Sequence, residues 1–113
     1  MLNVRLDGLP TGIPCLVDSG AAANRFSAEI AEQLDIKRED APLERFSAGA
    51  QTYSGWFTSV QLSVEEWTWE APVFFAYDWQ PSYQLLGLEG FFRFFTVCFH
   101  TVDDYFELEL AEH

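Results

Sequence analysis

The sequence is poor in basic residues. Only six lysines and arginines stand against 18 aspartates and glutamates, which gives a formal net charge of −12 at pH 7. Such a chain repels phosphate backbones and anionic lipid headgroups, and no basic stripe offsets that repulsion. We therefore expect no nucleic-acid partner and no membrane partner.

Cysteine and histidine are also scarce. Cys15 and Cys98 lie far apart and form no C-x-x-C pair, so we expect a pair of buried, reduced thiols, with one long-range disulfide as the alternative. His100 has only Asp103 and Asp104 near it as potential metal ligands, and these do not complete a site. The sequence thus predicts no metal and no cofactor.

Long apolar runs are missing as well. No stretch approaches the roughly 20 residues that span a bilayer, and Met1 is not followed by a signal peptide. We expect a soluble chain, located in the cytoplasm, with residues 1–113 forming one domain that is either complete or excised from a longer protein. Aromatic residues, in contrast, make up 17% of the chain, which predicts an aromatic-rich core or aromatic surface buried against another chain.

Short alternations of polar and apolar residues predict a mainly β chain. Residues 2–6 and 13–17 are expected to pair as a hairpin, and β character continues over 45–77 with an interruption or bulge at Pro72. A final hairpin is expected over 95–110. These patterns indicate about seven short strands in a barrel-like fold.

Two short helices are expected among these strands. Ser27 is a good N-cap for a helix over 28–35. The second half of QLLGLEGFFRFF, residues 84–95, predicts the other helix.

Residues 14–24 read PCLVDSGAAAN and place one aspartate, Asp18, directly after an apolar run. One interpretation of Asp18-Ser19-Gly20 is a surface turn, because all three residue types favour turns. Another makes Ser19 a catalytic nucleophile. That requires a general base, for which the chain offers only two histidines, and Val17 stands where the serine signature has glycine.

A third interpretation rests on a wider resemblance. The stretch CLVDSGAAANRFSAEIAEQL resembles the retropepsin-like aspartic proteases around their Asp-Thr/Ser-Gly motif. Further on, YQLLGLEGFFRFFTVCF resembles the apolar-apolar-Gly element, short helix and returning strand of the same family. The interval from Asp18 to Gly87 is similar to that in single-domain members, and the resemblance covers about residues 2–110. It implies a closed β-barrel with two short helices that forms a C2 homodimer.

The resemblance also implies an activity, aspartic endopeptidase. Asp18 of each chain would face its counterpart, and the two carboxylates would share one proton and activate a water against the peptide carbonyl. Gly20 would allow a tight backbone turn, and Ser19 would hydrogen-bond to the partner loop. Because the chain carries one such motif, the active site requires two chains around an extended peptide or protein substrate.

A flap is implied for residues 46–57, as a hairpin that closes over the peptide. Its tip is expected near Ala48, Gly49 and Ala50, and Tyr53 is a candidate substrate contact or an ordinary strand residue. The rival function from another class is a catalytically silent module that keeps the fold for dimerisation or peptide binding.

One position predicts the pH dependence. Ala21 follows Gly20 where the pepsin-like branch typically carries serine, whose hydroxyl can donate to the aspartate. The loss of a donor to the charged form of a carboxylate raises its pKa. We therefore expect an activity optimum that is moderately rather than strongly acidic.

Overall fold

The computed structural model describes residues 1–7, 11–48, 50–100 and 105–110. This part of the chain contains nine strands and two short helices. The strands are β1 (Leu2–Leu6), β2 (Ile13–Val17), β3 (Asn24–Ser27), β4 (Glu44–Ala48), β5 (Gln51–Val64), β6 (Trp67–Ala76), β7 (Gln84–Leu86), β8 (Phe95–His100) and β9 (Tyr105–Leu110). The helices are α1 (Ala28–Gln33) and η1 (Leu88–Phe92).

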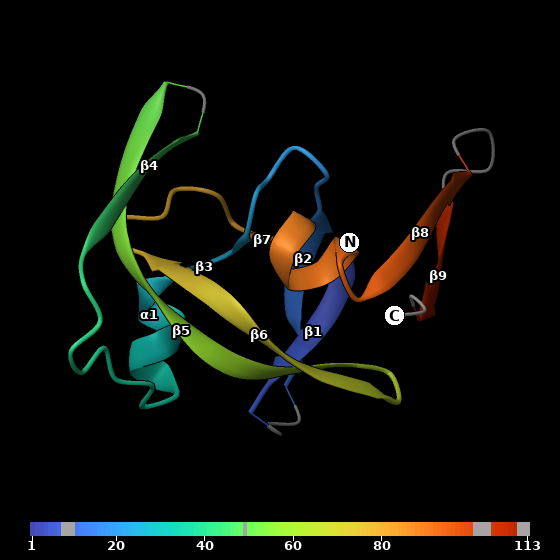
Figure 1. Ribbon diagram of the computed structural model, residues 1–113, viewed down its shortest axis with the longest axis horizontal. Coiled ribbons are helices and arrows are strands. Elements are labelled where there is room, and N and C mark those ends of the chain that lie inside the picture. The colour runs from blue at the N-terminus through green and yellow to red at the C-terminus, as the bar shows by residue number, and fades with distance from the viewer. Residues whose placement is uncertain (8–10, 49, 101–104, 111–113) are drawn as a thin grey trace.

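Six of the described strands close into a barrel. They follow the order β1-β2-β7-β3-β6-β5, and β5 pairs back onto β1 (Figure 1). The pairs β2–β7 and β3–β6 are parallel, whereas the other pairs around the barrel are antiparallel. The expected mainly β barrel with two short helices is confirmed, and dimerisation stays a prediction.

The barrel interior is filled largely by aromatic and branched side chains, as expected. The largest fully buried side chains include Phe26, Phe75, Phe91 and Phe95. Trp69 packs edge-on against Phe95 with ring centroids 4.8 Å apart. These contacts join the barrel to η1 and to the start of β8.

The strands differ from the expectation in two ways: the interruption expected at Pro72 is absent, and one strand was not predicted. β6 runs through Pro72 without a break and pairs with β5 on both sides of it. β3 pairs with β6 only from Val73 onward, so Pro72 has a strand neighbour on one side, where a missing N–H is tolerated. The second difference is β3, which sequence patterning did not predict because four residues are too short to show a period.

The helix α1 begins where the sequence predicts. The Ser27 Oγ accepts a hydrogen bond from the Glu29 N–H at 3.2 Å, which caps the first turn. The helix ends at Gln33, two residues before the predicted end. Neither helix in the described ranges is long and apolar enough to cross a membrane.

The strands β8 and β9 form a separate two-stranded ribbon that stands beside the barrel (Figure 1). Leu110 pairs with the buried Phe95, so it shares the barrel-facing side of the ribbon, yet it is 57% exposed. Cys98, on β8, is exposed and Cys15, on β2, is buried; both thiols are free. The expectation of reduced thiols is confirmed, but the expected burial of Cys98 is wrong because the ribbon packs on one face only.

Because the Cys15 thiol is buried, we expect the free energy of unfolding to decrease at alkaline pH. Burial raises the pKa of Cys15 to about 12, from 9.0. The thiol therefore stabilises the folded chain below about pH 9, and this contribution is lost as the pH rises toward 12. Between pH 8 and 10.5, urea unfolding should show roughly 2 kcal/mol more loss in wild type than in Cys15→Ala. Cys98→Ala is the matched control and should behave as wild type; equal losses in all three proteins would contradict the assignment.

Candidate functional site

Asp18 lies directly after β2, at the start of the loop that leads to β3. This loop rises between the β4–β5 hairpin and the β8–β9 ribbon (Figure 1). The Asp18 side chain is half-buried, and its Oδ1 accepts a hydrogen bond from the Gly20 N–H at 2.8 Å. A Cβ at position 20 would lie 3.1 Å from that same oxygen, so glycine gives the carboxylate room. Ser19 is exposed between them.

The Asp18 loop is bonded to the chain around Gly87. The Asp18 N–H donates to the Leu86 carbonyl at 2.9 Å. The Leu88 N–H donates to the Ala21 carbonyl at 2.9 Å, and the next residue pair repeats this bond at 3.0 Å. The two sequence segments of the family resemblance, 69 residues apart at Asp18 and Gly87, are therefore side by side in the fold.

Asn24 locks these segments together from inside the barrel. Its side chain is fully buried; Oδ1 accepts from the Gly87 N–H at 3.0 Å and Nδ2 donates to the Gly90 carbonyl at 3.0 Å. Trp69 Nε1 donates to the same Gly90 carbonyl at 2.9 Å. The approach is so close that a Cβ on Gly90 would lie 2.1 Å from the Asn24 amide nitrogen.

The shape of η1 makes the Gly90 carbonyl available. The Phe92 N–H bonds to the Gly87 carbonyl at 3.1 Å and the Arg93 N–H to the Leu88 carbonyl at 2.9 Å, each five residues back. Such widened π-type turns occur often at functional sites. Here the turn leaves the Gly90 carbonyl to the two side-chain donors.

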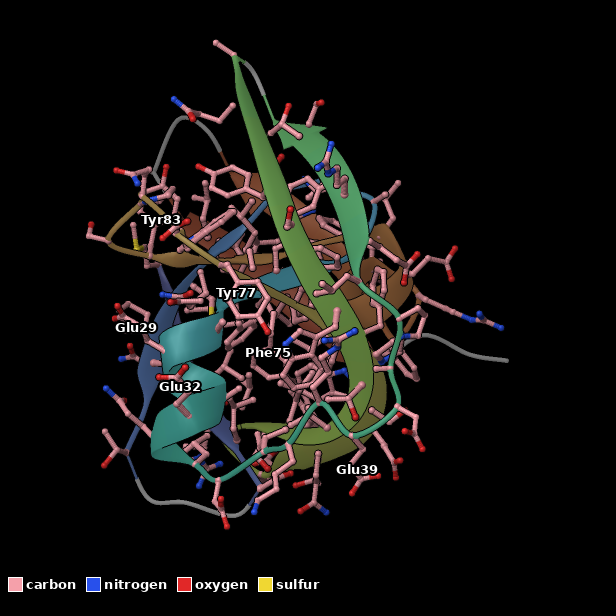
Figure 2. The ribbon with its side chains drawn as sticks, turned by 90° about the vertical axis from the view of Figure 1, so that its left-hand side faces the viewer. Glu29, Glu32, Glu39, Phe75, Tyr77 and Tyr83 are labelled. Atoms are coloured by element: carbon pink, nitrogen blue, oxygen red, sulfur yellow. The ribbon has the colours of Figure 1, made fainter. Side chains whose placement is uncertain are left out.

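The predicted flap is a hairpin formed by β4 and the first half of β5. Ala48 pairs with Gln51, and Ala50 is exposed, whereas Gly49 lies outside the described residues. Figure 2 shows the two twisted strands of this hairpin extending beyond α1. The hairpin separates from the barrel at Gly55, the residue of β5 that pairs with both β4 and β6.

Aromatic side chains hold the base of the hairpin. Tyr53 is buried and stacks on Phe46 with ring centroids 5.4 Å apart. Phe46 in turn packs edge-on against Phe74 of β6, at 4.8 Å. Trp79, in the loop after β6, lies 4.9 Å from the Tyr53 ring. This cluster is separate from the main barrel core.

Three hollows in the described part of the molecule are lined by other residues than Asp18. One of about 420 Å³ lies between α1 and the loop after β6, bordered by Glu29, Glu32 and Tyr77. Figure 2 labels these three residues, which lie at and beside α1. The other two, of about 430 and 410 Å³, flank the β8–β9 ribbon. Among the described residues, no group of three or more His, Cys, Asp or Glu side chains is arranged to hold a metal ion.

No protein family, curated protein sequence or solved structure matches this chain. The fold is that of a small, mainly β protein with a closed, mixed barrel of six strands in its described part. Within it, two residues that the sequence motifs did not single out lie close to Asp18 in the chain, Asn24 and Arg25. Asn24 had one sequence signal, a polar side chain in an otherwise small and apolar run, and its role required knowledge of the contact with Gly90.

The Asn24 bridge predicts a large stability effect. Asn24→Ala leaves the buried Gly87 N–H without its acceptor and removes one donor from the Gly90 carbonyl. We expect the free energy of unfolding to fall by about 2 to 3 kcal/mol. Urea titration followed by tryptophan fluorescence measures it. Asn3→Ala, at an exposed position of β1, is the control and should change stability by no more than about 0.5 kcal/mol. Similar losses in the two variants would contradict this role for Asn24.

Proposed function

We propose that this chain is an aspartic endopeptidase of the retropepsin-like type, active as a homodimer. The observation that carries the proposal is the setting of Asp18. Its carboxylate follows a barrel strand, accepts the Gly20 N–H, and sits on a loop bonded to β7 and η1. A lone surface turn has no need of such a support. The buried amide of Asn24 bonds to Gly87 and Gly90, where the backbone approaches closely. Such support is expected for a carboxylate whose position must be fixed.

In this proposal the reaction uses Asp18 of both chains. Two carboxylates about 3 Å apart share one proton. The ionised carboxylate takes a proton from water, and the water oxygen bonds to the peptide carbonyl carbon. The protonated carboxylate donates to the carbonyl oxygen as the tetrahedral intermediate forms. Protonation of the amide nitrogen then allows the C–N bond to break, which releases an acid and an amine.

Two features of the single chain support a dimer. Asp18 is half-buried, and the chain carries one Asp-Ser-Gly motif, so a pair of aspartates needs the Asp18 of a second chain. At the end of the β8–β9 ribbon, Leu110 is 57% exposed, and it is a candidate for the isologous contact of a C2 pair. The β4–β5 hairpin would close over the peptide with its tip near Ala48, Gly49 and Ala50, and Tyr53 would contact the peptide only if the hairpin moves.

The first test is the loss of activity in Asp18→Asn. Asparagine keeps an oxygen for the Gly20 N–H, so the fold should persist while cleavage of a denatured protein falls at least about a hundredfold. Asp40→Asn, at an exposed loop position, is the matched control and should cleave as wild type does. Activity per chain should rise with protein concentration until the dimer is saturated. Cleavage that survives in Asp18→Asn would remove Asp18 from the mechanism.

The second test is the pH profile. Ala21 is 2% exposed and has no hydroxyl to donate to Asp18. We therefore expect an activity optimum that is moderately rather than strongly acidic. An optimum below about pH 3 would contradict this expectation.

The same assay separates the proposal from its rival. If wild type cleaves nothing between pH 3 and 8 at any concentration, yet binds extended peptides, then the chain is a silent peptide-binding module. Peptide binding is measured by fluorescence anisotropy at the protein concentrations used in the cleavage assay.

A further inference from the structure

Arg25 shares the outer face of the barrel with Asp18. Leu16, Leu85 and Arg25 are in register across the neighbouring strands β2, β7 and β3. Residues in register lie on the same face of a sheet, and Asp18 follows two residues after Leu16 on that face. Asn24, next to Arg25, points into the barrel instead. The Asp18 carboxylate and the Arg25 side chain therefore arise from the same side of the sheet, two strands apart.

The Arg25 guanidinium is held beneath the base of the β4–β5 hairpin. Its Cζ lies 3.7 Å from the centroid of the Phe46 ring, a cation–π contact that fixes the plane of the group. Phe74, in register with Arg25 on β6, supports the Phe46 ring from below. The side chain is only partly exposed, so its charge is presented at one place on this face.

Arg25 forms no ion pair with a carboxylate of the described residues, although the protein carries 18 acidic residues. Its Nε is buried and has no hydrogen-bond partner. Burial lowers the pKa of Arg25, and the attraction of the Asp18 charge opposes that shift. Because the Nε is closed to solvent, a ligand carboxylate would have to bind at the terminal nitrogens of the guanidinium.

We propose that Arg25 binds a carboxylate of the substrate peptide beside the Asp18 site, so that peptides with Asp or Glu within two residues of the scissile bond are preferred. The proposal rests on the proposed endopeptidase function and adds a substrate class to it. An extended peptide rises about 3.3 Å per residue, so a side chain within two residues of the bond at Asp18 is in reach of the neighbouring Arg25. The same contact would also accept the C-terminal carboxylate of a short peptide.

The test is cleavage of a random decapeptide mixture, with sites identified by mass spectrometry. The digest is made at pH 6 and 0.15 M salt, where Glu is ionised and the chain's overall negative charge is screened beyond about 8 Å. Wild type should cut within two residues of Asp or Glu about tenfold or more often than within two residues of Asn or Gln, after correction for composition. An equal frequency would overturn the proposal while leaving the endopeptidase function intact.

Variants assign the preference to Arg25. Arg25→Gln should lose it and Arg25→Lys should keep part of it, whereas Arg93→Gln, an exposed arginine beside η1, is the matched control and should keep all of it. A preference that persists in Arg25→Gln would overturn the proposal. If Arg25→Gln does not fold, wild type alone is decisive. At a pH below about 4 the peptide carboxylates are protonated, so the preference for Asp and Glu must decrease there. A preference that stays constant with pH would overturn the proposal.

A second mixture with amidated C-termini separates the two sources of the carboxylate. Enrichment of Asp and Glu in both mixtures identifies the side chain as the ligand. Cleavage that depends on the free C-terminus, without that enrichment, overturns the side-chain preference. No cleavage of either mixture by wild type contradicts the endopeptidase function and, with it, this inference.

Discussion

The buried amide of Asn24 is the interaction on which this structure depends most. It connects β3 to the segment around η1, through Gly87 and Gly90, which lie 63 and 66 residues after Asn24 in the chain. An amide has both a donor and an acceptor, so one side chain accepts from the buried Gly87 N–H and donates to the Gly90 carbonyl, which it shares with Trp69 Nε1. Because β7 and η1 are positioned by this bridge, the Asp18 loop bonded to them is positioned as well.

The aromatic residues divide into two groups with different consequences. The larger group fills the barrel and surrounds η1, where Trp69 contacts Phe91, Phe94 and Phe95. The smaller group, around Tyr53 and Phe74, lies outside the barrel and supports the base of the hairpin. The second group contacts Arg25 through the Phe46 ring, on the outer face of the barrel. The described part of the chain therefore has two apolar clusters, one that fills the barrel and one at the base of the β4–β5 hairpin.

Much of the fold was predictable because its signals are local. The β1–β2 hairpin, the capped start of α1 and the β8–β9 hairpin follow from alternation and from Ser27. The unbroken β6 was not, because the effect of Pro72 depends on whether β3 reaches that position. The exposure of Cys98 was missed for a similar reason, since it depends on which face of the ribbon the barrel covers. β3 itself is too short to be visible as a pattern.

By itself, the sequence determined the strand-rich character, the acidic surface and an aspartate that ends an apolar strand before a tight turn. These are properties of neighbouring residues, and they narrow the function to a few chemistries. Only the tertiary structure decided that the Asp18 loop is bonded to Leu86 and Leu88, that Asn24 bonds to the same segment, and that Arg25 shares a face with Leu16. Those three facts depend on contacts between segments that are distant in the chain, which no local pattern encodes. The physical reason is that burial and register are collective: one closed barrel sets them for all of its strands together.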